Sequence, residues 1–149
     1  MSHRRTLLAA LLAFSAWHAA IISVAAQTSY TLPKDLRWIP DRTNGAPPGA
    51  FYAILRGKDG DRCGELVREK FRDGFVYPWH VNKTYGIYTI LSGTLVIGFD
   101  KRHSKTAEKA LPAGSVMQGL ATEPHYGRAV GETVFDVYGP PCEIVKTGK

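Results

Sequence analysis

Glu69 is the acidic residue whose position in the sequence most directly suggests chemistry. It lies between Val67 and Phe71 in the run Leu66–Phe71, and in a strand these three side chains would point to the same face. If that apolar face is buried, the carboxylate needs a cation or a hydrogen-bond donor beside it. A metal ion would meet that need, a nearby Arg or Lys would meet it as well, and a solvent-exposed face would remove it. The same argument applies to Asp136.

Aromatic side chains with polar tips gather in the sequence around two histidines, His80 and His125. These aromatic residues are Trp79, Tyr85, Tyr88 and Tyr126. Rings of this kind suit a cavity that binds a small polar or aromatic ligand or a sugar. They also suit an ordinary hydrophobic core, so both interpretations are open. Each histidine likewise has a plain alternative, a neutral imidazole satisfied by the backbone or by Asn82.

Several other chemistries are excluded by the motifs that the sequence lacks. It contains no Gly-x-Ser-x-Gly elbow, no CxxC pair, no phosphate loop and no dinucleotide fingerprint. The formal net charge of +6 comes from basic residues that are scattered among acidic ones. A dispersed excess of this kind is typical of a solvated surface, and no nucleic-acid partner is expected.

Short strands must position these residues. β-branched and aromatic runs recur roughly every eight to twelve residues between Gly, Pro, Asp and Ser, which favours an antiparallel sandwich or barrel. With 15 Gly and 9 Pro, the chain has little capacity for a helical bundle. We expect turns at 92–93 and 131–132 and a polar surface loop at 101–109. The expected strands are 51–55, 66–71, 75–80, 85–91, 94–99, 115–120, 124–130 and 133–138.

The segment GFVYPWHVNKTYGIYTILSG, from Gly74 to Gly93, is similar to the first sequence motif of the cupin superfamily. His80 stands at the first histidine position of that motif. Asn82 stands where the motif has its second histidine, and Gly86 where it has a glutamate.

The segment GSVMQGLATEPH, from Gly114 to His125, resembles the second cupin motif and ends on its histidine. Leu120 and Thr122 replace the proline and glycine of that motif. The resemblance extends over nearly the whole chain after residue 50. It implies an all-β fold with a single cupin-type jelly-roll β-barrel at 50–142, an extended N-terminal segment at 27–49 and a C-terminal tail at 143–149.

The resemblance also implies a divalent metal held inside the barrel by imidazoles and a carboxylate. The candidate ligands here are His80, Asn82 and His125, with Glu69 replacing the missing glutamate from a neighbouring strand. The metal would be Mn, Fe, Ni or Zn. Because Asn82 is a weak ligand and Gly86 offers none, the site is degenerate.

Residues 1–26 have the anatomy of a secretory signal peptide. Arg4 and Arg5 precede a long apolar run that closes on Val24-Ala25-Ala26, small residues of the type that a signal peptidase reads. We expect cleavage and export to the periplasm or the extracellular space, without stable membrane insertion. An uncleaved membrane anchor is the alternative.

Two cysteines, Cys63 and Cys142, allow one intramolecular disulfide in an oxidising compartment. Two unpaired thiols are the alternative.

Three functions follow from these patterns. The first is an exported barrel with a degenerate metal site that binds a small polar or aromatic ligand. The candidate ligand-binding residues are Trp79, Tyr85, Tyr88 and Tyr126. The second is a metal-dependent enzyme of the oxygenase, isomerase or lyase type that uses His80 and His125. The third is a scaffold that acts as a homodimer.

Overall fold

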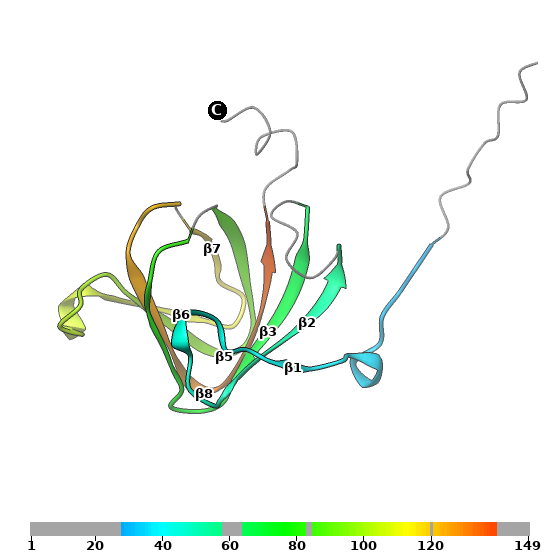
Figure 1. The fold of residues 1–149 in the computed structure, drawn as a ribbon, viewed down its shortest axis with the longest axis horizontal. Coiled ribbons are helices and arrows are strands. Elements are labelled where there is room, and N and C mark those ends of the chain that lie inside the picture. The colour runs from blue at the N-terminus through cyan, green and yellow to red at the C-terminus, as the bar shows by residue number, and fades with distance from the viewer. Residues whose placement is uncertain (1–27, 58–63, 83–84, 120, 140–149) are drawn as a thin grey trace, which may run out of the picture. The chain divides into compact units, whose positions relative to one another are not determined.

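The fold is all-β, because most of the chain is made of short runs that alternate inward and outward side chains. The structure, a computed structural model, describes residues 28–57, 64–82, 85–119 and 121–139 (Figure 1). Residues 28–30 are the described part of one unit, and the residues from Thr31 onward form another. Three short 3-10 turns accompany the strands: η1 (Pro33–Asp35), η2 (Thr43–Gly45) and η3 (Lys105–Ala107). The strands are β1 (Ile39–Pro40), β2 (Ala50–Arg56), β3 (Leu66–Phe71), β4 (Val76–His80), β5 (Gly86–Gly98), β6 (Glu108–Pro112), β7 (Val116–Gly119) and β8 (His125–Tyr138).

Two long strands, β5 and β8, belong to both sheets of the barrel. The first half of β5 pairs with β7 and with the second half of β8, which in turn pairs with β3. The second half of β5 pairs with β6 and with the first half of β8, which also pairs with β4. All these pairs are antiparallel, and β2 and β1 extend the sheet beyond β3. The arrangement is an all-β jelly roll, as the sequence predicts.

The expected turns at 92–93 and 131–132 are wrong, because β5 and β8 run through both positions as bent strands. The register of β5 against β8 shifts on either side of Ser92, and Gly93 has a φ of 68°. A Cβ on Gly93 would lie 2.5 Å from the carbonyl oxygen of Glu132, so only glycine allows this close approach. The bends let one strand serve two sheets.

The polar stretch 101–109 was also only partly predicted. Residues 101–107 form a loop with η3, but β6 begins at Glu108 and pairs with the second half of β5. Its sequence, Glu-Lys-Ala-Leu-Pro, does not alternate between polar and apolar residues, and hydrophobic alternation therefore gave no signal for this edge strand.

The core lies between the two sheets and contains a cluster of aromatic rings. Phe71 packs against Phe75 and Tyr77, and edge-on against Phe135. Leu95 and Ile97 from β5 fill the other side of this cluster. The rings therefore occupy one part of the barrel interior and leave space beside them.

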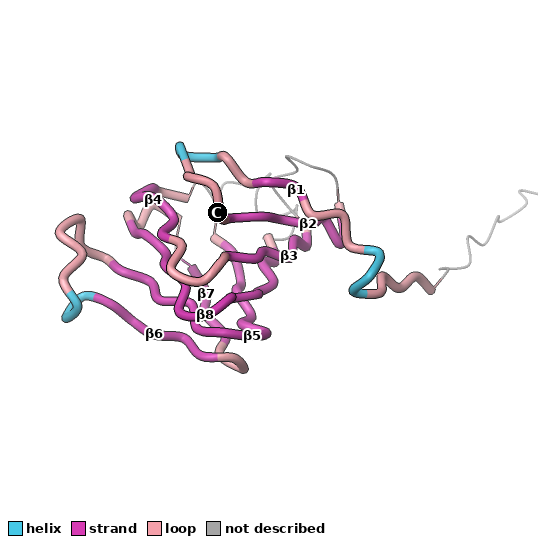
Figure 2. The backbone as a smooth tube through the Cα atoms, turned by 90° about the horizontal axis from the view of Figure 1, so that it is seen from below, coloured by secondary structure: helices cyan, strands magenta, loops and turns pink. Residues whose placement is uncertain are grey.

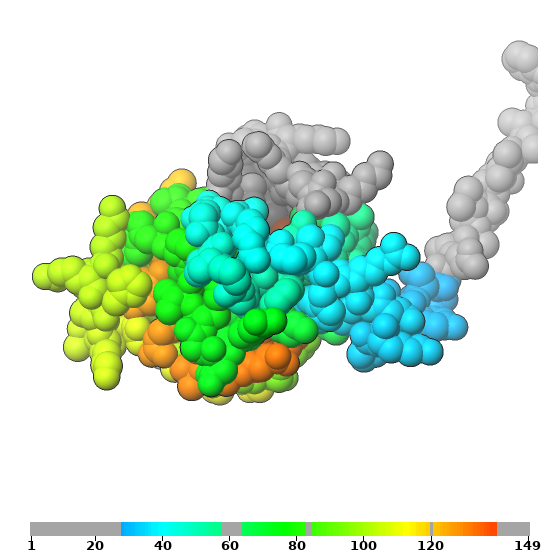
Figure 3. Space-filling view, turned by 60° about the horizontal axis from the view of Figure 1, so that its bottom comes forward, coloured from blue at the N-terminus to red at the C-terminus, as the bar shows by residue number. Residues whose placement is uncertain are grey.

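The N-terminal segment crosses the barrel after pairing with it. Ile39–Pro40 forms an edge strand on β2, and η2 then lies against β4 (Figure 2). Figure 3 shows the cyan part of this segment lying over the green surface of the barrel. We call residues 41–46 the strap, because they leave β1, contact β4 through η2 and lead back to β2.

Candidate functional site

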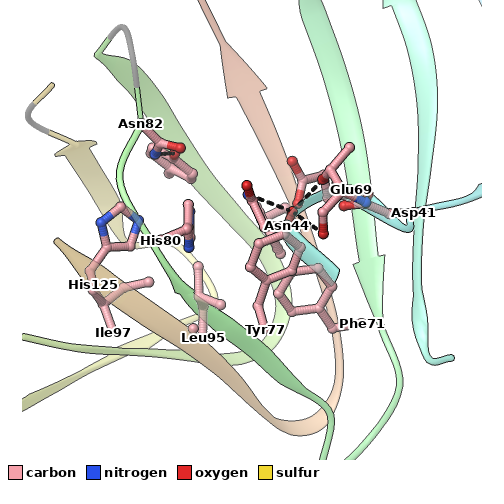
Figure 4. Close-up of a pocket in the computed structure, with 14 residues that line it drawn as sticks. Asp41, Asn44, Glu69, Phe71, Tyr77, His80, Asn82, Leu95, Ile97 and His125 are labelled. Carbon is pink, nitrogen blue, oxygen red and sulfur yellow. Dashed lines mark hydrogen bonds between the residues drawn. The ribbon is translucent and has the colours of Figure 1, made fainter. Parts of the chain in front are cut away.

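A cavity of about 250 Å³ lies inside the barrel, between the strap, β3, β4, β5 and β8 (Figure 4). His80, Asn82 and His125 form what we call its imidazole end. Asp41 and Glu69, with Tyr77 beside them, form its carboxyl end. Aromatic and aliphatic side chains and one glycine complete the wall, from Phe71, Tyr88, Leu95, Ile97, Gly127 and Phe135.

An irregularity in β4 places His80 inside the barrel. Tyr77 already points inward, and strict alternation would turn His80 to the opposite face. The register of β4 against β8 shifts between these residues, around Pro78, which has no N–H to donate to the ladder. His80 thereby becomes the direct cross-strand partner of His125.

The two imidazoles are held in matching orientations. Their ring centroids lie 4.3 Å apart with planes at 59°. His80 Nδ1 lies 2.8 Å from the carbonyl oxygen of Pro78, and His125 Nδ1 lies 2.8 Å from that of Glu123. Since a carbonyl only accepts, each Nδ1 carries the hydrogen and donates it, which leaves Nε2 of each ring with a lone pair. The pair therefore offers two basic nitrogens at one end of the cavity.

The environment keeps His80 neutral. Burial lowers its pKa and outweighs the bond to the Pro78 carbonyl, which raises it. The neighbouring His125 lowers the pKa further, because two imidazolium charges at this distance would repel each other.

Gly86 leaves little vacant space, because Val137 and the ring of Tyr88 both approach it. A Cβ on Gly86 would lie 3.3 Å from the Tyr88 ring, and one on Gly119 would lie 2.9 Å from it. Asn82 Nδ2 donates a hydrogen bond of 3.1 Å to the Tyr88 hydroxyl. Burial, followed by the nearby Glu69 carboxyl, raises the pKa of Tyr88. The tyrosine is thus a neutral wall of the cavity, and it links the two ends.

Glu69 lies on the inner face of β3, opposite Phe135, and lines the cavity. Within the described residues, no hydrogen-bond donor or cation reaches its carboxyl group, and the surface that the side chain retains faces the cavity. Burial, followed by the negative charge of Asp41, raises the pKa of Glu69 to about 8. Protons therefore compete with any cation for this carboxyl near neutral pH.

Asp41 reaches the same end of the cavity from the strap. Its Oδ1 accepts hydrogen bonds from the backbone N–H of Thr43 at 2.8 Å and from the Thr43 hydroxyl at 2.7 Å. The Thr43 hydroxyl also bonds to the Tyr77 hydroxyl, which Asn44 Nδ2 approaches at 3.4 Å. Burial raises the pKa of Tyr77, so its hydroxyl stays protonated. A network from the strap to β4 therefore fixes the carboxyl end.

The strap residues Asp41, Thr43 and Asn44 belong to the cavity wall, and the sequence reasoning did not identify them. They fall in the extended segment at 27–49 and match no motif. The short spacing Asp41-x-Thr43, typical of an Asx-type turn, was the signal that could have drawn attention to this stretch.

The structure brings together five of the eight predicted site residues. His80, Asn82, His125, Glu69 and Tyr88 line the cavity. Trp79, Tyr85 and Tyr126 do not belong to its wall. Tyr126 is fully buried outside the cavity, where its hydroxyl donates to Glu108 Oε1 at 2.6 Å, and Trp79 lies 6.5 Å from it between ring centroids. They alternate with the inward histidines along β4 and β8.

Asp136 is not a cavity residue either. Its carboxylate accepts two hydrogen bonds from Arg68, at 2.7 and 2.8 Å, on the side of the sheet away from Glu69. The arginine alternative, considered for both acids in the sequence, applies to Asp136.

The residues present do not make a complete metal site. The two imidazoles fit as ligands, since backbone carbonyls fix their tautomers and leave both Nε2 atoms available. In the described part of the chain, however, no three His, Cys, Asp or Glu side chains lie close enough together to share an ion. Glu69 sits with Asp41, away from the histidines (Figure 4). Cys63 and Cys142 lie outside the described residues, so their disulfide stays a prediction. Among the described residues, no helix is long and apolar enough to cross a bilayer.

Comparison with solved structures identifies relatives by shape. The polyketide cyclase RemF from Streptomyces resistomycificus is 16% identical, with a TM-score of 0.61 over 74% of this chain and 78% of that one. KdgF from a Halomonas species is 17% identical, with a TM-score of 0.58 over 78% and 99%. An RmlC-like cupin from Shewanella frigidimarina is 14% identical, with a TM-score of 0.57 over 80% and 96%. A scan against protein-family models and a search of curated protein sequences each gave no match. At these identities the likeness concerns the fold.

Proposed function

Since the chain has the fold of the cupin superfamily, we propose that it binds a small polar organic ligand in the cavity inside its barrel. The observation that carries this proposal is the wall of that cavity, where aromatic rings alternate with polar groups that have spare hydrogen-bonding capacity. Such walls are typical of sites that fix a small molecule by a few polar contacts and bury the rest of it. The sequence of residues 1–26 further supports a role outside the cytoplasm.

Filling the cavity tests this proposal. Gly127 lines the cavity on β8, and a Cβ there would meet only ordinary contacts at 3.8 Å from Phe71, Leu95 and Ile97. Gly127→Leu therefore places a side chain in the ligand space with little backbone strain. Val130→Leu, at an exposed position on the same strand, is the matched control.

The measurement is a thermal-shift and NMR screen of small polyols, amino alcohols, phenols and hydroxy acids against the mature protein. We expect compounds that raise the melting temperature and shift the His80 and His125 ring signals in the native protein and in Val130→Leu, and that do neither in Gly127→Leu. A screen without such compounds, or binding that persists in Gly127→Leu, contradicts the proposal.

A second candidate, a metal-dependent enzyme of the oxygenase, isomerase or lyase type, is favoured by one observation. The two imidazole rings lie 4.3 Å apart between centroids, and each Nδ1 is bonded to a carbonyl oxygen, which leaves the lone pair on Nε2. Near-stoichiometric Mn, Fe, Ni or Zn in the protein from its native export route, lost in a His80→Ala, His125→Ala double variant, would support it. Absence of metal after incubation with each of the four ions would reject it.

A further inference from the structure

The carboxyl end of the cavity has two acids and no cation. Asp41 and Glu69 both line it, and the negative charge of Asp41 is close enough to raise the pKa of Glu69. No Lys or Arg is among the described residues of the cavity wall. A carboxylate removed from bulk water needs a compensating positive charge or takes up a proton, so a cationic occupant would take the place of the proton on Glu69.

The nearest arginines in the sequence do not supply that charge. Arg42 Nη1, in the strap, donates to the backbone carbonyl oxygens of Asp41 and Pro47, at 2.9 and 3.3 Å. Arg68, which precedes Glu69, points to the other side of the sheet and is held by Asp136. Both guanidinium groups therefore have partners other than the carboxyl pair.

The wall beside the two acids is aromatic. Phe71 lies 5.8 Å from Tyr77 in a stacked arrangement and 5.1 Å from Phe135 in an edge arrangement, between ring centroids. All three rings line the cavity. Ring faces attract cations, and carbon-clad cations benefit from the apolar contact as well. A hydrated metal ion would gain nothing from these rings.

We infer that the carboxyl end binds a small organic ammonium ion, with its charge between Asp41 and Glu69 and its alkyl groups against Phe71, Tyr77 and Phe135. This inference rests on the proposed ligand-binding function and names the ligand class. Anionic ligands are excluded from this end by the two carboxyls. The ligand's polar tail would extend toward the imidazole end, where the two Nε2 atoms accept hydrogen bonds from a hydroxyl or amine.

The test compares two probes of nearly equal shape that differ in charge. Choline carries a quaternary nitrogen, and 3,3-dimethylbutan-1-ol has carbon in its place. Binding of each to the mature protein is measured by calorimetry or NMR at fixed pH and salt, with EDTA present to exclude metal ions. We expect choline to bind at least tenfold more tightly than the alcohol.

Variants locate the effect. Glu69→Gln preserves shape and should reduce choline affinity at least tenfold while leaving the alcohol unchanged, and Asp41→Asn should act in the same direction. Glu132→Gln, at an exposed position in β8, is the control and should change nothing. Because Asp41 also accepts a hydrogen bond from Thr43, the Asp41→Asn result is interpreted only if this variant keeps the melting temperature of the native protein. The Glu69→Gln result tests the inference by itself.

Failure of the inference and failure of the proposed function give different results. Equal affinity for choline and the alcohol, lost for both in Gly127→Leu, would overturn the ammonium class and leave a ligand-binding cavity. Choline affinity that is unchanged in Glu69→Gln would also overturn it. Binding of neither probe would overturn it too, and the compound screen would then decide the proposed function alone.

Discussion

The acidic residues on the two sides of the sheets differ in their hydrogen-bond partners and in the direction in which their pKa values are shifted. Away from the cavity, Glu108 accepts hydrogen bonds from Arg128 and Tyr126, and these partners lower its pKa to about 2. On the cavity side, Glu69 has no such partner, and burial beside Asp41 raises its pKa to about 8. The same fold therefore pairs Glu108 with hydrogen-bond donors and leaves Glu69 without one among the described residues.

The difference separates residues that hold the barrel together from those that are free to meet a ligand. A paired acid stabilises the folded state, because both charges and their hydrogen bonds are satisfied within the protein. An unpaired buried acid opposes folding and is expected where a binding partner compensates it. Substitutions should therefore destabilise the protein more on the outer side of the sheets than around the cavity.

The largest expected effect is that of Gly98→Ala. A Cβ on Gly98 would overlap the ring of Tyr126, which is fully buried and anchored by Glu108. Displacing that ring should lower the free energy of unfolding by about 3 kcal/mol, measured by urea denaturation. Gly127→Ala, on the neighbouring strand and facing the cavity, should cost less than about 1 kcal/mol. Equal losses at the two glycines would remove the contrast in packing.

The next effect is the loss of a partner on the outer side. Arg128→Met removes the guanidinium that contacts Glu108 at 2.6 and 3.1 Å and should destabilise the protein by about 2 kcal/mol at pH 7. A double variant that also carries Glu108→Gln should recover part of this loss, because no unpaired charge is left. A double variant no more stable than Arg128→Met would show that packing, not charge, accounts for the pair.

Glu69→Gln should have the opposite sign and a smaller size. Because the pKa of Glu69 in the folded protein exceeds its usual value of 4.5, its contribution to stability is complete below about pH 4.5 and is lost as the pH rises to about 8. The glutamine variant escapes this loss and should gain about 1–2 kcal/mol over the native protein between pH 5 and pH 9, after allowance for screening by water in the cavity. If the free energy of unfolding depended on pH in the same way in both proteins, the interpretation of Glu69 as an acid without a partner would be contradicted.

The smallest effect concerns the imidazole end. Since burial and His125 both lower the pKa of His80, its NMR titration should have a midpoint below the usual histidine value. His125→Gln should move that midpoint upward, as one source of repulsion is removed. A downward or absent shift would show that the two rings do not influence each other. By linkage, the stability associated with His80 is present above its unfolded pKa and is lost as the pH falls below it.

The strand pattern of the sequence predicted most of the barrel. The run Leu66–Phe71 was predicted with its observed bounds as β3, because alternation and flanking turn residues mark a half-buried strand. The bends at Ser92–Gly93 and Gly131–Glu132 were misjudged as turns, since a glycine in a bulge has the same sequence signature as one in a turn. Strand β6, with the sequence Glu-Lys-Ala-Leu-Pro, gave no alternation to detect.

The candidate site was predicted in part. The resemblance to the cupin motifs identified His80 and His125, strand alternation identified the inward Glu69, and all three line the cavity. Asp41 was missed because the strand before it has only two residues, Ile39 and Pro40, which are too few to show an alternating pattern in the sequence. Tyr126 and Trp79 were placed near the histidines by sequence proximity, but alternation along a strand turns adjacent residues to opposite faces.

The sequence by itself determined the strand periodicity, the glycine positions and the residue types available for chemistry, because these are local properties of the chain. Tertiary structure alone decided which acids received partners. Arg68 reaches Asp136 on the strand paired with its own, and Arg128 on β8 reaches Glu108 on β6 across the intervening strand β5. Glu69 meets Asp41 because the strap crosses the barrel. Local pattern cannot specify such meetings, since they depend on strand register and on which sheet each bent strand joins.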